Sequence, residues 1–311
     1  ENYAALALNK DGKNATIAAT DVTFDIKGDS KKAKNGAEGG VITIDGETGE
    51  VDVIVAYISY GNTYYSFTTI EAAIAKANAG ETVTLLRDIT ASAIITIDKA
   101  ITLDGNGKKL TSTAGRAINV ETEGNVTIEN LTINAGERAI NIINFPANVT
   151  VNNVTATAKN NAVMMATSAA GAKLTVNNSD FTGLAVVNVA SENSQVVINN
   201  TNITNVDANE AENYGAITVY STATNANVTV IGGSITVADD SKKAYIFAEG
   251  ATVTGVDQIG QIVAMIGEAG YETLTEAIAD AKEGQTVKMV DDVTGPGVVI
   301  NKNTVIDFNG K

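Results

Sequence analysis

The sequence has no cysteine, no histidine and no tryptophan, only two prolines, and 5% aromatic residues in a chain of 311. Without cysteine there are no disulfide frameworks, no thiolate zinc sites and no thiol nucleophiles. Without histidine the chain lacks the commonest general base and the commonest metal ligand. These absences exclude much of ordinary enzyme chemistry, and we expect a protein that uses no cofactor and no metal.

Basic residues are also scarce, with 21 Lys and Arg against 36 Asp and Glu, a formal net charge of -15 and a pI near 4.4. They do not cluster into a stripe that would replace counterions, so nucleic acid and anionic membranes are disfavoured as partners. No stretch approaches the roughly 20 apolar residues of a membrane span, so we expect no membrane insertion. No signal segment opens the chain, and we expect that a signal peptide lies outside it.

The chain is instead rich in Val, Ile, Thr, Ala, Asn and Gly, and 44% of its residues are hydrophobic. β-Branched residues favour strands, and Asn and Gly favour the tight turns between them. A chain of this length and hydrophobicity can bury a large core. The composition therefore predicts a folded, all-β protein.

The first part of the chain is repeated near its end. Glu1-Asn2-Tyr3 recurs as Glu212-Asn213-Tyr214, and Asn14-Ala-Thr-Ile aligns with Asn227-Val-Thr-Val. Further matching pairs are Asp29–Ala33 with Asp240–Ala244, Ala37–Gly39 with Ala248–Gly250, Gly80 with Gly284, Asp88 with Asp292, Lys99 with Lys302, and Lys108 with Lys311.

A repeat of this length indicates modules in tandem. We predict that residues 1–53 are the C-terminal coils of a preceding module, residues 54–262 a complete module, and residues 263–311 the start of a following module. Both ends of the chain then fall inside modules, and their strands would lack neighbours. We expect end-to-end stacking of this chain in a crystal, and the sequence does not predict an oligomeric state.

A shorter period lies within the complete module. Asn125-Val-Thr-Ile recurs as Asn148-Val-Thr-Val and Lys173-Leu-Thr-Val, which predicts a parallel β-helix with coils of roughly 23 residues. The Val and Ile are expected to point inward and the Thr outward, because side chains alternate along a strand. Asn or Gly recurs five residues after each strand begins, and these residues enter the left-handed region most readily. The expected outward ladder is Thr127, Thr150, Thr175, Thr229 and Thr252, and the expected corner is Asn130, Asn153, Asn178, Asn200 and Gly232.

A short helix is predicted ahead of the coils. The segment near 68–79 has the apolar spacing of an amphipathic helix, between a capping box at Thr68 and Glu71 and a stop at Gly80. The segment near 273–283 repeats this pattern. A solenoid has open sheet edges at its ends, so each helix is expected to cap one solenoid.

The order of these features resembles the pectate-lyase-like right-handed parallel β-helix superfamily. The helix is followed by Gly80-Glu-Thr-Val-Thr-Leu, by Ile101-Thr-Leu-Asp-Gly-Asn-Gly-Lys108 and by the Asn-rich coils, and the resemblance covers about residues 65–258. It implies a right-handed solenoid. The tandem copies resemble the non-enzymatic branch, which is found in bacterial surface proteins and adhesins. The hydrolase signature needs His, which is absent, and the Trp- and Pro-containing lyase motifs have no counterpart here.

Two arginines are candidate ligand-binding residues. Arg116 and Arg138 each precede a strand in successive coils, which would stack them about 4.8 Å apart. Glu121, Glu123 and Glu137 lie close in sequence, so the pair is either a uronate site with a lyase-like base or two solvated residues at the corner of the coil.

The one aromatic cluster contains two further candidates. Tyr57 and Phe67 align with Met265 and Tyr271, which indicates packing positions. Tyr60 and Tyr64 have no counterparts in the second copy, so we single them out as contacts that would stack on sugar rings.

The sequence favours a non-catalytic structural or adhesive module of a bacterial cell-surface or secreted protein. The alternatives are a glycan-binding solenoid that uses Tyr60 and Tyr64, and an acidic-polysaccharide lyase that uses Arg116 or Arg138. Host or microbial glycans or proteins are the expected partners, and the expected location is extracellular.

Overall fold

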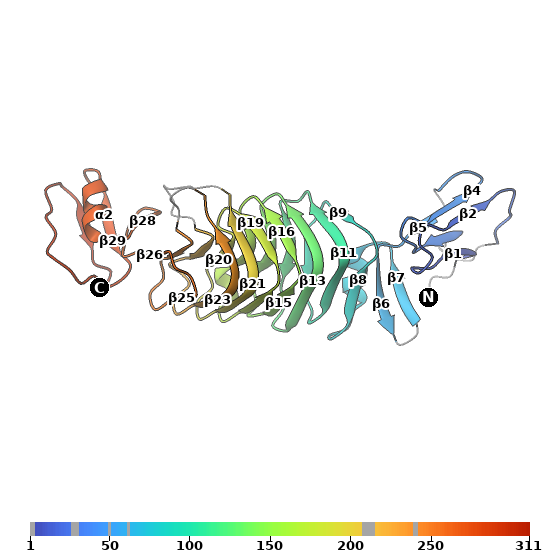
Figure 1. The fold of residues 1–311 in the computed structure, drawn as a ribbon, viewed down its shortest axis with the longest axis horizontal. Helices are drawn as coiled ribbons and strands as arrows, with labels where there is room; N and C mark the ends of the chain where they lie inside the picture. The colour runs from blue at the N-terminus through green and yellow to red at the C-terminus, as the bar shows by residue number, and fades with distance from the viewer. Residues whose placement is uncertain (1–3, 26–30, 49–50, 61–62, 207–214, 239–241) are drawn as a thin grey trace.

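The computed structural model describes residues 4–25, 31–48, 51–60, 63–206, 215–238 and 242–311. They form an elongated molecule in which a parallel β-solenoid lies between a smaller N-terminal segment and a smaller C-terminal segment (Figure 1). The α-helices of this part of the chain are two, each of seven residues. Neither has the length and apolar character needed to cross a membrane. The predicted all-β solenoid is confirmed.

One wall of the solenoid is an eight-stranded parallel sheet. In it Ile95 pairs with Ile118, and Ile118 pairs with Ile140, so that one coil takes 22 or 23 residues. Its strands, in spatial order, are β10 (Ile95–Ile97), β12 (Arg116–Val120), β14 (Arg138–Ile142), β17 (Asn161–Met165), β20 (Val187–Val189), β22 (Ile217–Val219), β24 (Ala244–Ile246) and β26 (Ile259–Gln261).

The remainder of each coil belongs to a second sheet, which turns at a repeated corner. Strand β13 (Asn125–Ala135) pairs with β15 (Asn148–Asn152) before the corner and with β16 (Thr155–Ala158) after it. Asn130 at the corner has a φ of 51°, in the left-handed region that Asn tolerates. Positive φ values also occur at Asn153, Asn178, Asn200 and Gly232, which confirms the predicted corner.

The other strands of the solenoid in this second sheet are β8 (Thr82–Leu85), β9 (Ile89–Ala91), β11 (Thr102–Ser112), β18 (Lys173–Asn177), β19 (Asp180–Gly183), β21 (Gln195–Asn205), β23 (Asn227–Thr236) and β25 (Thr252–Thr254). A 3-10 helix spans Thr167–Ala169.

Side chains alternate across the strands as expected. In β13, Val126 is 1% exposed and Ile128 is 0% exposed, and both belong to the apolar cluster that runs through the solenoid. Burial of such a side chain contributes roughly 1.5–3 kcal/mol.

The outward ladder of threonines ends on Thr254 and not on the predicted Thr252. Thr254 is the register partner of Thr229, and its Oγ1 donates to Thr229 Oγ1 at 3.3 Å. The alignment of that last coil was wrong by two residues.

Asparagines also form ladders between coils. Asn177 Nδ2 donates to Asn152 Oδ1, and Asn199 Nδ2 donates to Asn177 Oδ1, both at 2.8 Å. A side-chain amide has one donor group and one acceptor group, so equivalent asparagines one coil apart satisfy one another. The coil length and the ladder therefore support the same register.

The predicted helices are present. Helix α1 (Ile70–Lys76) packs against the hairpin of β6 (Ala56–Tyr60) and β7 (Thr63–Phe67) and against β8 and β10, at the N-terminal end of the solenoid. Its N-cap is Thr69 and not Thr68, since Thr69 Oγ1 accepts from Ala72 N at 3.2 Å. Lys99 Nζ donates to Ala75 O at 2.6 Å, near the negative end of the helix.

The N-terminal segment repeats the strand arrangement of the last coils of the solenoid. Strands β1 and β3 pair as β22 and β24 do, and β2 and β4 pair as β23 and β25 do, all in parallel. One offset of 211 relates the two sets, so Asn14 corresponds to Asn225 and not to Asn227, and both have positive φ, at 54° and 56°. The strands are β1 (Leu6–Leu8), β2 (Thr16–Ala19), β3 (Ala33–Asn35), β4 (Val41–Ile44) and β5 (Val51–Val53).

The C-terminal segment repeats the start of the solenoid. An antiparallel hairpin of β27 (Ala264–Ile266) and β28 (Ala269–Tyr271) precedes α2 (Leu274–Asp280), β29 (Thr286–Met289) and β30 (Val305–Asp307). Strand β29 pairs with β27 and β30 as β8 pairs with β6 and β11. The division of the chain at residues 53 and 262 into modules stays a prediction.

Candidate functional site

The structure places Arg116 and Arg138 on adjacent strands in direct register. Neighbouring strands lie about 4.8 Å apart, so the two side chains leave the backbone as neighbours. Burial lowers the pKa of Arg138, and the positive charge of Arg116 lowers it further, although a guanidinium stays protonated. Arg138 Nε is buried and has no hydrogen-bond partner among the described residues. The pair thus concentrates positive charge and leaves one donor unused.

The carboxylates near this pair in sequence offset its charge only in part, because the charge of Glu137 raises the pKa of Arg138 against the larger effects of burial and of Arg116. Glu121 instead accepts hydrogen bonds from Asn119 Nδ2 at 3.1 Å and from Asn144 Nδ2 at 3.2 Å. In the part of the chain that is described, neither arginine forms an ion pair within 4.0 Å, and no group of three or more Asp or Glu side chains could hold a metal ion. The arrangement can bind an anion.

The aromatic cluster lies where the hairpin β6–β7 meets the N-terminal segment. Tyr64 Oη donates to Asn9 Oδ1 at 3.2 Å, and its ring contacts the ring of Tyr57 edge-on, with centroids 5.9 Å apart. Lys10 Nζ lies 5.9 Å from the Tyr57 centroid. Tyr64 is 38% exposed, so part of its ring faces solvent. Tyr60 is the last residue of β6, and its side chain lies outside the described residues.

Arg87 joins the N-terminal segment to the solenoid. Its Nη2 donates to Ala37 O at 2.7 Å and to Asn35 O at 3.4 Å, and its Nε donates to Ile54 O at 3.1 Å. Hydrogen bonds from a charged donor are stronger than neutral ones. The sequence prediction did not single out Arg87, because its acceptors are backbone carbonyls and its counterpart in the second copy is Asp291.

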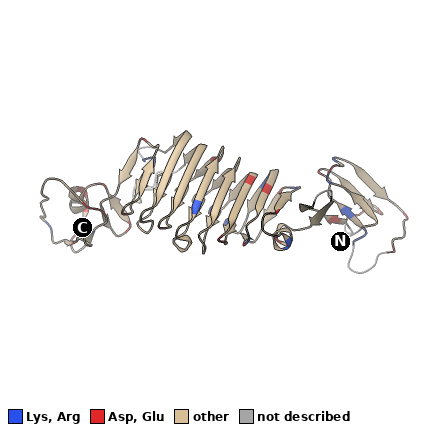
Figure 2. Cartoon of the chain, turned by 90° about the horizontal axis from the view of Figure 1, so that it is seen from below, with Lys and Arg blue, Asp and Glu red and all other residues tan. Residues whose placement is uncertain are grey.

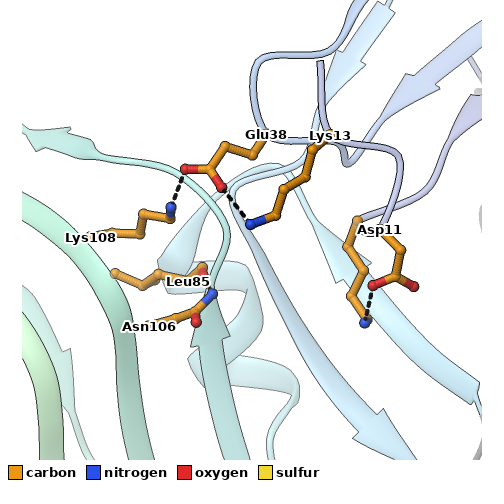
Figure 3. A network of polar contacts seen from close by, with 7 residues as sticks. Asp11, Lys13, Glu38, Leu85, Asn106 and Lys108 are labelled. Carbon is orange, nitrogen blue, oxygen red and sulfur yellow. Dashed lines mark hydrogen bonds and ion pairs between the residues drawn. The ribbon is translucent and has the colours of Figure 1, made fainter. Parts of the chain in front are cut away.

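An acidic side chain of the N-terminal segment lies between two lysines (Figure 3). Glu38 Oε1 lies 2.5 Å from Lys108 Nζ, and Glu38 Oε2 lies 3.5 Å from Lys13 Nζ. The hydrogen bond and the charge of Lys108 hold the pKa of Glu38 below its ordinary value. Asn106 Nδ2 donates to Leu85 O at 3.1 Å and so holds the turn that carries Lys108. A Lys–Glu–Lys contact thus bridges the first junction.

The second junction contains an equivalent ion pair. Lys311 Nζ pairs with Glu249 Oε2, and these residues are the repeat counterparts of Lys108 and Glu38. The hydrogen bond that Lys311 donates to the Glu249 carboxylate raises the pKa of Lys311. Asn309 Nδ2 donates to a backbone oxygen at 3.1 Å, as Asn106 does at the first junction.

The two junctions also share their backbone hydrogen bonds. At each junction the connecting strand bonds to the last coil before it, to the hairpin after it and to the strand that follows the helix. The first junction has Ile54 N to Asn35 O at 3.0 Å, Val55 N to Phe67 O at 2.9 Å and Leu86 N to Val55 O at 2.8 Å, and the second has Ile262 N to Ile246 O at 2.8 Å, Val263 N to Tyr271 O at 2.9 Å and Val290 N to Val263 O at 2.9 Å.

The side chains that fill the two junctions differ. At the second junction Phe247 stacks on Tyr220, with centroids 6.3 Å apart, beside a cleft of about 600 Å³ that Glu249 and Lys311 also line. The counterparts of Phe247 and Tyr220 at the first junction are Gly36 and Asn9. There the Tyr64 hydroxyl donates to Asn9 Oδ1, so the two junctions are filled by different side chains.

The fold and these contacts define a parallel β-solenoid with a smaller segment at each end, and its two junctions share backbone hydrogen bonds and a Lys–Glu ion pair. Comparison with protein-family models, with curated proteins and with solved structures finds no match. The expected membership of the pectate-lyase-like superfamily therefore stays a prediction, as does its non-enzymatic branch.

Proposed function

We propose that this chain is a non-catalytic structural or adhesive part of a bacterial cell-surface or secreted protein in which β-solenoid modules follow one another in tandem. The observation that carries the proposal is the repeated junction. The same backbone hydrogen bonds and an equivalent Lys–Glu pair join the end of a solenoid to the hairpin and the first strands that follow it, once at residues 33–108 and once at residues 244–311.

The properties of the solenoid suit a spacer that presents its faces to solvent. Each coil contacts mainly its neighbours, so added modules extend the rod without a change in its cross-section. The outward positions of the strands are mostly uncharged polar residues, and charged residues are scattered over the solenoid rather than gathered in one patch (Figure 2). The net charge of -15 favours repulsion between separate rods.

The location is tested by antibody labelling of intact cells that produce the protein. We expect labelling without permeabilisation, and loss of labelling after an external protease is added. Labelling that requires cell lysis would contradict the proposal. Rotary-shadowed electron micrographs of the purified protein are expected to show rods and not globules.

A second candidate function, binding of an anionic glycan, is favoured by the unpaired donor of Arg138 next to Arg116. The test is calorimetric titration with uronate oligosaccharides. Binding that disappears in Arg138→Gln and persists in the matched exposed-site control Lys173→Gln would support this function. Release of an unsaturated product would instead identify a lyase, and absence of both signals would remove the site.

A further inference from the structure

The contacts at the first junction connect residues that are far apart in the chain. Arg87 and Ala37 are 50 residues apart, Lys108 and Glu38 are 70 apart, and Tyr64 and Asn9 are 55 apart. Backbone connectivity alone does not bring such residues together. A flexible linker would leave them in solvent. The first junction is therefore a packed contact between two folded surfaces.

The second junction has its own long-range contacts at the same place in the fold. Lys242 Nζ pairs with Glu272 Oε2 at 2.7 Å, and Gln261 Nε2 donates to Asp291 Oδ2 at 3.0 Å. Phe247 lies in an apolar cluster with three other buried residues from both sides of the junction. The cluster consists of Tyr245, Phe247, Ile262 and Val290.

We infer that the last coils of each solenoid form a docking surface for the hairpin and the first strand of the next copy of the same module, and that this surface holds consecutive solenoids at one orientation. The inference rests on the proposed function, because the partner that it names is the neighbouring module of a tandem array. It makes the array a stiff rod with a defined angle at each junction, and not a string of independently tumbling domains.

Arg87 and Asp291 are counterparts, and each matches the docking surface that it faces. Among the described residues the hydrogen bonds of Arg87 all go to backbone carbonyls, and the facing strand β5 carries the apolar Val53. Asp291 meets the amide of Gln261, which is the residue at the place of Val53 in the second copy. A positive side chain faces carbonyl oxygens, and a negative one faces an amide donor. The complementarity at each junction is therefore specific to that pair of surfaces.

The test is a spin-label distance measurement in the full chain. The absence of cysteine allows labels at introduced cysteines only, at the exposed positions Glu47 in the N-terminal segment and Glu123 in the solenoid. We expect a narrow distance distribution in the protein that carries the two labels and no other substitution. The double variant R87Q/K108Q is expected to broaden it at least twofold, because the links that Arg87 and Lys108 make across the first junction are lost.

The matched control is R116Q/K173Q, which removes one arginine and one lysine outside the junction and is expected to leave the distribution unchanged. A second label pair within the solenoid, at Glu123 and Glu192, is expected to give one narrow distance in every variant. That result shows that the variants are folded.

A broad distribution without R87Q/K108Q would overturn the fixed orientation. A narrow distribution that persists in R87Q/K108Q would overturn the role of these side chains. Failure of the proposed function is distinguishable, because it is read from the labelling of intact cells: a narrow distribution in a protein found inside cells removes the function and leaves the docking surface.

Discussion

The N-terminal segment and the last coils of the solenoid have the same strand arrangement but bury their apolar residues to different degrees. Ile217 and Val228 are 0% exposed in the solenoid, whereas their counterparts Leu6 and Ile17 are partly exposed. The coils from β10 to β21 lie beneath the first pair. The N-terminal segment thus follows the same backbone path without those neighbouring coils, but its apolar side chains are not fully buried.

The reason lies in the range of the interactions. Asn14 and Asn225 adopt left-handed corners with φ values of 54° and 56°, although one lies in the small segment and the other in the solenoid. The corner depends on one residue and its immediate neighbours. Burial depends on a coil above and a coil below, so it varies with position in the stack.

The largest expected effect separates the two regions by burial. Ile217→Ala is expected to destabilise the solenoid by about 2–5 kcal/mol, because it leaves a cavity in a packed core. Leu6→Ala is expected to cost about 1 kcal/mol, because the side chain is already partly hydrated. Hydrogen exchange of the amides of β22 and β1 measures each effect locally. Equal losses would contradict the distinction drawn from burial.

The corners are expected to behave alike. Asn225→Ala and Asn14→Ala each place a Cβ-bearing residue without a polar side chain at positive φ, at an expected cost of about 1–2 kcal/mol. Exchange rates of the flanking strands measure both costs. Asn→Gly at the same two positions is the control, and it is expected to be close to neutral. A cost confined to Asn225 would show that stacking, and not φ, dictates the corner.

The N-caps of α1, at the start of the solenoid, and of α2, in the C-terminal segment, allow a second comparison between equivalent positions. Thr69→Ala and Thr273→Ala each remove the side-chain acceptor of a first-turn amide, at an expected cost of about 1 kcal/mol. Thr69→Ser and Thr273→Ser keep the acceptor and are expected to retain the stability. Thermal melts followed by circular dichroism measure these losses. A loss at only one cap would show that the two helices are not equivalent.

The smallest expected effect concerns the pH response of the first junction. The pKa of Glu38 is depressed in the folded protein, so its contact with Lys108 stabilises the junction above the ordinary Glu pKa of 4.5 and loses that stabilisation as the pH falls through the depressed value. In the spin-label experiment the wild-type distribution is expected to broaden below about pH 4.5. Glu38→Gln should remove this pH dependence, and an unchanged response would assign it to another group.

Much of the fold was predictable from the sequence. The Val-Thr-Ile alternation and the recurring Asn gave the coil length and the corner, because both depend on residues close in the chain. The wrong alignments at Thr252 and Asn14 arose where a short motif matches equally well two residues away, and backbone pairing resolved them. The N-cap at Thr69 was missed by one residue because Thr68 has the same chemistry.

The candidate sites were less predictable. The register of Arg116 with Arg138 follows from the coil length and was expected, but the unpaired Nε of Arg138 depends on burial by side chains around it. Tyr64 was assigned to solvent and glycans because it has no counterpart in the repeat. The structure gives it a contact with Asn9 that only the packing of the junction creates.

The sequence by itself determined the coil, its corners and the two helices, since these depend on side-chain alternation, on left-handed Asn and Gly and on caps a few residues long. Only the tertiary structure decided how the solenoid meets the segment at each of its ends. The acceptors of Arg87 are backbone carbonyls 33 to 52 residues away, and a carbonyl carries no mark in the sequence. The contact between folded surfaces exists only after both have formed.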